Sequence, residues 1–336
     1  MLKPYVVVPS WNGATVLPEC LDSLLTQSIK AHIIVVENGS TDNSLKLLRT
    51  KYPMVEVVVL QKNRGFAGGV NSGIKKAISE GAEYVASFNN DATANKSWLK
   101  QLVEFMDKNP KVGIATGKIV SSKNNTLDST GDIYTIWGLP FPRGRGEPIS
   151  NQYDKDAIVF GASGGASLYR VKMLEQIGLF DEDFFAYFED VDLSFRAQLT
   201  GWKIAYLPEA VVDHQIGATS GRIKGFATYH TLKNLPLLLW KNVPWALMPR
   251  VYPRFVLAYC SFTGRTLYRG QFGPLFKGLF MCAVLWPKKM IERHKIQGRR
   301  NVSVAYINSI ISHDLPPNAH HLRKLRSSWQ KLKKIN

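Results

Sequence analysis

The sequence of 336 residues contains only three cysteines, Cys20, Cys260 and Cys282, which lie far apart. None has the C-x-x-C spacing that is typical of metal-binding or redox motifs, and the low number argues against a disulfide-stabilised fold. We therefore expect all three to be buried apolar residues in a reducing compartment. The first residues also lack the long apolar core of a signal peptide, and we expect 5–8 to form the first strand of the fold.

Acidic residues are almost absent from the C-terminal third of the chain. Residues 221–336 contain 21 Lys and Arg but only two carboxylates, Glu292 and Asp314, whereas residues 1–220 contain 22 Lys and Arg and 24 Asp and Glu. The net charge of +17 therefore belongs to the C-terminal part. Basic residues mixed with large apolar ones favour an anionic membrane surface as the partner, and we expect no nucleic-acid partner.

Long uncharged apolar runs are also missing from this basic region. In the apolar segments 235–270 and 274–289, the longest uncharged stretches, 255–264 and 278–287, have ten residues each, whereas a spanning helix needs about 20. We therefore expect amphipathic helices that lie in the membrane interface, including one in the basic segment 320–336. The alternative is an ordinary helical subdomain whose Lys and Arg side chains face water.

The first part of the chain alternates strand and helix signals. Apolar runs without alternation predict strands at 5–8, 32–36, 55–60 and 83–88, and each is followed by a run with helical periodicity. This pattern predicts an α/β, Rossmann-like, mostly parallel sheet flanked by helices, with a ligand beyond the carboxyl ends of the strands. The glycine-rich fingerprint of a dehydrogenase is absent after the first strand, which argues against that class of enzyme.

Polar loops follow all four predicted strands, and parallel strands bring such loops to one edge of the sheet. Asp91 can hold a hard divalent cation that bridges a diphosphate, although in isolation it could equally form a turn or cap a helix. Lys62 and Arg64 can face phosphate oxygens. The four loops are PSWNG (9–13), ENGSTD (37–42), KNRGFAGG (62–69) and NNDA (89–92).

A group of carboxylates begins a predicted helix in the middle of the chain. Glu189, Asp190 and Asp192 follow the aromatic stretch FFAYF at 184–188, and Gly201 is expected to end the helix. The positive end of the helix dipole favours anions by about 0.3–1 kcal/mol each, which suits a general base that stays ionised at neutral pH. Plain helix capping is the alternative, but the aromatic rings are suited to stacking on a sugar.

The rest of the middle region is less regular. The segment 132–148 is rich in Gly, Pro and aromatic residues and predicts a long surface loop. His214 follows the strand predicted at 202–207, and its imidazole could complete a metal site with Asp91, although a single histidine is more often structural.

Six motifs along residues 4–221 resemble the inverting nucleotide-sugar glycosyltransferases of family 2, which have the GT-A fold. The chain looks most like the bacterial rhamnosyltransferase branch, which uses dTDP-L-rhamnose to build cell-surface polysaccharides. PFPRGRGEP (140–148) and GATSG (217–221) support that branch. The six motifs are VVVPSWNG, VVENGSTD, NRGFAGGVNSGI, FNNDA, GASGGASLYR and FDEDFFAYFEDVDLSFRAQLTGWKIAYLPEAVVDH.

The resemblance implies a role for each matching residue. Asp190 would be the catalytic base, with Glu189 beside it assisting, and Asp91 and His214 would hold Mg²⁺ or Mn²⁺. The donor would be a dTDP- or UDP-sugar. The residues expected to bind this nucleotide sugar are Pro9, Asn12, Glu37, Asp42, Arg64, Gly65, Asn71 and Asn90.

Two positions depart from the family pattern. Many relatives have Asp in place of Glu37, which changes the reach toward the base. The D-x-D-like metal motif begins here with Asn89, so that binding of the metal would depend more on the diphosphate of the donor.

The resemblance also implies how the chain is divided and what it does. Residues 1–221 would form the GT-A domain, and residues 222–336 a basic, amphipathic helical region that associates with the membrane. The enzyme would move L-rhamnose onto a lipid-linked saccharide as a peripheral protein at the cytoplasmic face of the bacterial inner membrane. The alternative is a catalytically weak nucleotide-sugar-binding domain that acts as a membrane-bound interaction protein. The sequence leaves the oligomeric state open.

Overall fold

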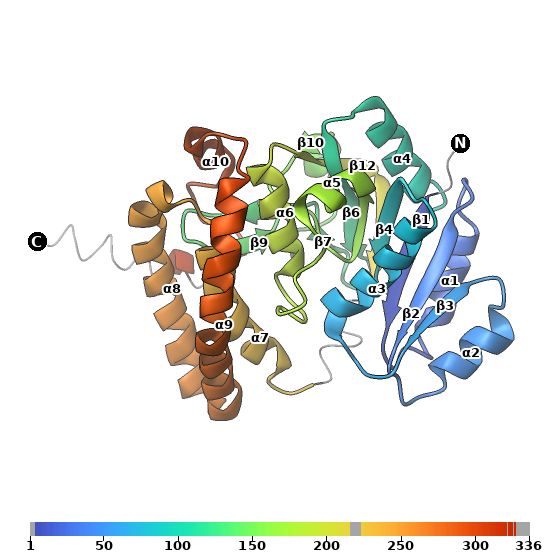
Figure 1. Ribbon diagram of the computed structural model, residues 1–336, viewed down its shortest axis with the longest axis horizontal. Coiled ribbons are helices and arrows are strands. Elements are labelled where there is room, and N and C mark those ends of the chain that lie inside the picture. The colour runs from blue at the N-terminus through green and yellow to red at the C-terminus, as the bar shows by residue number, and fades with distance from the viewer. Residues whose placement is uncertain (1–3, 216–222, 321, 325, 327–336) are drawn as a thin grey trace, which may run out of the picture.

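The structure, a computed structural model, is built on one ten-stranded mixed sheet with helices packed on it (Figure 1). It describes residues 4–215, 223–320, 322–324 and 326. The strands of this sheet are β1 (Tyr5–Ser10), β2 (His32–Asn38), β3 (Glu56–Leu60), β4 (Tyr84–Phe88), β5 (Ala92–Ala94), β6 (Val112–Ser121), β7 (Thr126–Ser129), β10 (Ala157–Ile158), β11 (Ala166–Arg170) and β12 (Lys203–His214).

The N-terminal half of the sheet is parallel, as the sequence predicts. The strands lie in the order β4-β1-β2-β3, with Val7 of β1 opposite Ile34 of β2. The chain moves outward from β1 to β3 and then returns to place β4 on the other side of β1. This reversal opens a crevice beyond the carboxyl ends of β1 and β4. The helices of this half are α1 (Leu17–Leu25), α2 (Ser44–Lys51), α3 (Gly65–Ser79) and α4 (Trp98–Lys108).

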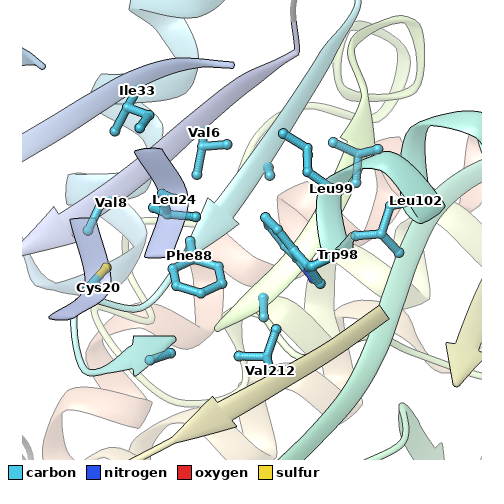
Figure 2. Close-up of a cluster of buried hydrophobic side chains, with 14 of the residues drawn as sticks. Val6, Val8, Cys20, Leu24, Ile33, Phe88, Trp98, Leu99, Leu102 and Val212 are labelled. Atoms are coloured by element: carbon cyan, nitrogen blue, oxygen red, sulfur yellow. The ribbon is translucent and has the colours of Figure 1, made fainter. Parts of the chain in front are cut away.

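Apolar side chains from both faces of the sheet form its core. Val6, Val8 and Phe88 point toward α1 and α4, where the ring centroid of Phe88 lies 4.9 Å from that of Trp98 (Figure 2). On the opposite face, Val7 packs among residues that include Val70 of α3. Strands buried on both faces explain why their sequences read as uninterrupted apolar runs.

The second half of the sheet is mixed. β11 runs antiparallel between β4 and β6, whereas β12 runs parallel to β6. Two helices pack against this half, α5 (Val171–Ile177) and α6 (Glu189–Leu199). Thr200 caps the end of α6, and Gly201 follows with φ +90°, so the predicted helix end is confirmed.

The prediction that residues 132–148 form a long surface loop is wrong for the first half of this segment. Residues there form a small hairpin of β8 (Asp132–Tyr134) and β9 (Pro140–Pro142), and the side chains of Tyr134 and Trp137 are buried. Helices from the C-terminal part of the chain cover these aromatic rings. A local pattern rich in Gly and Pro could not reveal this long-range burial.

The C-terminal part of the described chain is helical. Its helices are α7 (Phe226–Asn242), α8 (Met248–Tyr268), α9 (Phe272–Gly298) and α10 (Val304–Ile310). They share one hydrophobic cluster with the β8–β9 hairpin and α6. Among residues 4–215, 223–320, 322–324 and 326, none of the helices combines the length and hydropathy that crossing a bilayer requires. Most of the helix predicted at 320–336 falls outside the described residues, as does the GATSG stretch at 217–221.

The three cysteines have different surroundings. Cys20 is buried in the core and Cys282 is partly buried, but Cys260 is exposed on α8. The prediction that all three are buried is therefore wrong for Cys260, because it lies on the side of α8 that no other described element covers.

Candidate active site

A cleft of about 610 Å³ opens at the carboxyl ends of β1 and β4. It is lined by the loops after these strands, by the start of α6 and by the end of β12. The sequence-predicted site residues that line it are Pro9, Gly65, Asn90, Asp91, Glu189, Asp190 and His214. The cleft therefore brings together the expected metal ligands and the expected base.

Amide side chains hold the strand-end loops in place. Asn90 donates from Nδ2 to Ser10 Oγ at 3.0 Å, which ties the loop after β4 to the end of β1. Asn38 donates from Nδ2 to the carbonyl of Gly65 at 2.9 Å, which ties the end of β2 to the start of α3. Gly65 has φ +72°, and a Cβ there would collide with the backbone of Phe185, so only glycine fits.

Three predicted nucleotide-binding residues lie beside the cleft lining rather than in it. Asn12, Glu37 and Asp42 each accept a hydrogen bond from a backbone N–H, at 2.8, 2.7 and 3.0 Å respectively. The bonds of Asn12 and Asp42 connect the loop after β1 with the loop after β2. These side chains thus shape the two loops, and direct contact with a nucleotide stays a prediction for all three.

The other two predicted residues are also outside the lining. Arg64 pairs with Glu182 at 2.5 Å, and both side chains are partly exposed. Asn71 is buried in α3 and donates to the carbonyl of Phe180 at 2.8 Å. Asn71 therefore holds the segment that leads toward the acidic helix, and its predicted contact with a donor remains untested.

His214 lies between two carboxylates at the bottom of the cleft. Its Nε2 is 3.2 Å from Asp91 Oδ1, and its Nδ1 is 2.8 Å from Asp128 Oδ2. Burial alone would lower the pKa of His214, but the hydrogen bonds and charges of Asp128 and Asp91 raise it to about 9. Arg145 reaches Asp128 from the other side, with Nη2 2.7 Å from Oδ1, and the pKa of Asp128 is lowered by these partners against the effect of its burial.

This donor set fits a divalent cation. Asp91 offers a carboxylate oxygen and His214 offers Nε2, while Asn89 places its amide 3.3 Å from that nitrogen. Asp128 binds the other ring nitrogen and so fixes the orientation of the imidazole, as is usual for histidines that bind metals. A cation would replace the proton on Nε2, because metal ligands must be deprotonated. Asp91 and His214 therefore offer one oxygen and one nitrogen ligand for such a cation.

Two other acidic groups in the described chain have metal-like spacing. One joins His32, Glu56 and Glu80 at the sheet edge, where Lys76 bridges the two glutamates at 2.9 and 2.7 Å. The other joins Asp181, Asp183 and Glu292, and these surround the ammonium of Lys289. Lysine side chains therefore already balance the charge in both groups.

Asp190 sits in the first turn of α6, as predicted. Its Oδ2 accepts from the backbone N–H of Gly164 at 2.9 Å, and its Oδ1 accepts from that of Val191 at 2.8 Å. Burial raises the pKa of Asp190, and these backbone N–H groups counteract part of the rise. The adjacent Glu189 is more deeply buried, and its burial and the charge of Asp190 raise its pKa well above the usual range.

The aromatic stretch before α6 adopts an unusual backbone conformation. Phe185, Tyr187 and Phe188 all have φ between +66° and +72°, a left-handed region that bulky residues rarely occupy. Phe184 is fully buried, whereas these three rings line the cleft. This conformation delivers aromatic surface and the carboxylate of Asp190 to the same cavity.

Hydrogen bonds from helix α7 hold the aromatic stretch 184–188 in place. The buried Asn234 donates from Nδ2 to the carbonyls of Phe184, Ala186 and Tyr187 at 3.0, 2.9 and 2.8 Å. Lys233 donates from Nζ to the carbonyl of Asp183 at 2.6 Å, and its burial lowers its pKa to about 8. The C-terminal helices therefore fix the loop that presents the candidate base.

A network of buried ion pairs also joins the C-terminal helices α7 and α9 to α6 and the segment before it. Lys241 of α7 lies 2.6 Å from Asp181 and 2.9 Å from Asp192, and Lys289 of α9 lies 2.5 Å from Asp181. Asp192 also pairs with Arg196 at 2.9 Å. Among the three carboxylates that begin α6, Asp192 is thus structural, whereas Glu189 and Asp190 face the cleft.

Sequence reasoning missed Asp128, Asp132 and Arg145, which line or support the cleft. All three come from β7, β8 and the turn after β9, a part of the chain without periodic pattern. The one available signal was the pair of aspartates in DSTGD at 128–132, directly before the glycine- and proline-rich stretch.

Comparison with known proteins identifies the family. Residues 5–178, more than half of the chain, match the family model of glycosyl transferase family 2. An N-acetylglucosaminyl-diphospho-decaprenol L-rhamnosyltransferase of Mycobacterium tuberculosis is 26% identical over 241 residues, which cover 65% of this chain and 77% of that protein. A poly-beta-1,6-N-acetyl-D-glucosamine synthase of Staphylococcus epidermidis is 28% identical over 217 residues, 63% of this chain and 49% of that protein.

Solved structures share the fold. The crystal structure of GalNAc-T7 with UDP, GalNAc and Mn²⁺ matches with a TM-score of 0.57 at 16% sequence identity, over 73% of this chain and 48% of that one. The mixed, mostly parallel sheet flanked by helices is therefore the GT-A arrangement that the motifs imply. On the strength of the family model and this fold, the chain belongs to glycosyl transferase family 2.

Proposed function

We propose that the protein is a metal-dependent, inverting glycosyltransferase that moves L-rhamnose from dTDP-L-rhamnose onto a lipid-linked saccharide. One observation carries the proposal: Asp91 and His214, which suit a cation, line the same cleft as Asp190, which suits a base. Had these groups lain on separate surfaces, no single displacement could have used them all.

The donor would bind at the β1–β4 edge of the cleft. Asp91 and His214 would hold Mg²⁺ or Mn²⁺, which when bound supplies positive charge to the leaving diphosphate. Asp128 keeps the imidazole turned so that Nε2 faces Asp91. The nucleotide would lie against the part of the cleft lined by Pro9, after β1, and Gly65, after β3.

The acceptor would approach Asp190. The carboxylate takes the proton of the acceptor hydroxyl, and the oxygen then forms a bond to the anomeric carbon while the bond to the diphosphate breaks. Attack from the side opposite the leaving group inverts the configuration in one displacement. The N–H groups of Gly164 and Val191 hold the carboxylate in position throughout.

The choice of donor and acceptor is supported by the relative from Mycobacterium tuberculosis, whose name gives a rhamnosyl donor group and a lipid diphosphate acceptor. The test incubates the protein with Mn²⁺, N-acetylglucosaminyl-diphospho-decaprenol and either dTDP-L-rhamnose or UDP-GlcNAc. We expect transfer from dTDP-L-rhamnose alone, with inversion at the anomeric carbon by NMR. Transfer only from UDP-GlcNAc would contradict the donor, and retention would contradict the single displacement.

We further propose that α8 and α9 rest on the anionic cytoplasmic face of the inner membrane. Phe272, Phe276, Phe280 and Val284 follow each other at four-residue intervals along α9, and all are more than half exposed. Lys and Arg dominate the charge of this region. An exposed apolar ridge among basic residues is typical of helices that lie in a membrane interface.

The ridge begins next to the N-terminal end of α7, whose first residue lines the cleft. Near the start of α9, Gln271 accepts a hydrogen bond from Thr228 of α7 at 2.6 Å, two residues after Phe226, which lines the cleft. A lipid-linked acceptor could therefore stay anchored in the bilayer while its sugar enters the site.

A further inference from the structure

Asp132 is a mostly buried residue of the cleft. It is 7% exposed and lines the same cavity as Asp190. Within the described part of the chain it forms neither a side-chain hydrogen bond nor an ion pair. Asp128 differs, because it is bound by His214 and Arg145, whereas Glu189 Oε2 is likewise without a partner among the described residues.

The backbone holds Asp132 firmly in this position. Its N–H donates to the carbonyl of Gly161 at 2.7 Å, and the N–H of Gly161 donates back to its carbonyl at 3.2 Å. The turn that begins at Gly161 continues to Gly164, whose N–H binds Asp190. Asp132 and Asp190 therefore flank one short turn. Burial and, after it, the nearby charge of Asp190 raise the pKa of Asp132 well above its usual range, and the charge of Arg145 opposes this rise.

A mostly buried carboxyl that receives no hydrogen bond from the protein costs free energy unless water or a ligand supplies one. The carboxyl of Asp132 opens on the cleft, so a ligand there can supply that hydrogen bond. A carboxyl accepts hydrogen bonds from the hydroxyl groups of a sugar, whereas its negative charge, when it is ionised, repels a phosphate. The chemistry of Asp132 therefore matches a neutral, polyhydroxylated ligand better than a phosphate.

We propose that Asp132 binds a hydroxyl group of the acceptor saccharide next to the hydroxyl that Asp190 deprotonates. The inference rests on the proposed function, because it places the acceptor on the Asp190 side of the cleft. The expected nucleotide side, lined by Pro9 and Gly65, is built by other elements than the β8–β9 hairpin that carries Asp132. Asp132 would thus help to select the acceptor and leave donor binding unchanged.

The test compares Asp132→Ala and Asp132→Asn with the unmutated protein. The acceptor KM is measured with N-acetylglucosaminyl-diphospho-decaprenol, and the Kd of dTDP is measured with Mn²⁺ by calorimetry. We expect Asp132→Ala to raise the acceptor KM about tenfold, the loss expected for one or two hydrogen bonds, while the Kd of dTDP changes by less than about twofold. Asp132→Asn keeps a donor and an acceptor and should have a smaller effect.

Asp154→Ala serves as the matched control, because Asp154 is an exposed aspartate that pairs with Lys118 outside the cleft. An unchanged acceptor KM in both Asp132 variants would overturn the inference, and so would a weaker Kd of dTDP with an unchanged acceptor KM. If Asp132→Ala does not fold, the isosteric Asp132→Asn decides the question through the same two measurements. Absence of transfer by the unmutated protein would overturn the proposed function and the inference together.

Discussion

His214 Nδ1 lies 2.8 Å from Asp128 Oδ2, and this contact determines which ring nitrogen faces Asp91. The two residues are 86 positions apart in the sequence, and the pairing of β7 with β6, followed by that of β6 with β12, brings them together. The orientation of a histidine that binds a metal usually depends on such a partner. Asp128 is thus part of the site even though it would not touch the metal.

Replacing Asp128 by Asn should therefore weaken metal binding. We expect the Kd of Mn²⁺ to rise about 10- to 100-fold, the usual effect of losing a group that orients a ligand. Calorimetry on the protein without nucleotide measures this Kd directly. Asp154→Asn is the control. An unchanged Mn²⁺ affinity in Asp128→Asn would contradict a role of Asp128 in metal binding.

The interaction of His214 with Asp91 and Asp128 should make the stability of the protein depend on pH. The pKa of His214 is raised from 6.5 to about 9, so the folded state stabilises its charged form. This contribution, up to about 3 kcal/mol, is fully present below pH 6.5 and is lost as the pH rises through 9. Urea unfolding of the metal-free protein and of His214→Gln should show a stability difference that shrinks between pH 6.5 and 9.5. A difference that grows with pH would contradict the assignment.

Asp190→Asn should abolish transfer and spare donor binding. Loss of the base should lower kcat at least about 100-fold, while the Kd of dTDP with Mn²⁺ stays within about twofold. Because the pKa of Asp190 is raised, kcat/KM of the unmutated enzyme should fall as the pH drops through a value above that of an ordinary aspartate. Near-normal turnover of Asp190→Asn would show that another group is the base.

Asn234→Ala tests whether α7 positions the base. The variant removes the shared donor of three carbonyls, of which only that of Phe184 is fully buried, and this should cost roughly 1–3 kcal/mol of unfolding free energy. The loosened loop should also lower kcat about ten- to a hundredfold, because the base loses its fixed position. Asn109→Ala removes a similar bond, to the carbonyl of Phe105 at the end of α4, and should leave kcat unchanged. Equal kcat values in the two variants would contradict the role of Asn234.

Membrane binding should depend on the ridge of α9. Phe276 and Phe280 are 62% and 67% exposed, and replacing both by Ser should reduce binding to phosphatidylglycerol-containing vesicles at least about tenfold. Cosedimentation measures the loss. Met54→Ser, which changes a similarly exposed residue between α2 and β3, is the control, because these two elements lie on the other side of the molecule from α9 (Figure 1). Binding of both variants like the unmutated protein would assign another role to the ridge.

Sequence patterns predict the first half of the fold well and the second half less well. The strands that contain Val7, Ile34 and Phe88 are buried on both faces, so their local composition identifies them. The hairpin with Tyr134 is different, because its burial depends on helices that follow it by about a hundred residues. No local period encodes such a contact.

The residues of the site also divide into those that a local sequence pattern predicts and those that long-range contacts bring into place. Asp91 and Asp190 could be predicted because each follows a recognisable strand end or begins a helix. Asp128 and Asp132 could not, because only the return of the chain along β7 and β8 brings them to the cleft.

Lys241 of α7 and Lys289 of α9, which pair with Asp181, have a consequence for how this protein can evolve. Severing the polypeptide near residue 221 would leave Asp181 without Lys241 and Lys289, and Asp192 with Arg196 alone. The glycosyl transferase family 2 part of this chain therefore depends on its own C-terminal helices for these countercharges. A recombination that replaced the C-terminal helices would have to preserve lysines equivalent to Lys241 and Lys289. We therefore expect the sheet domain and the C-terminal helices to have evolved as one unit.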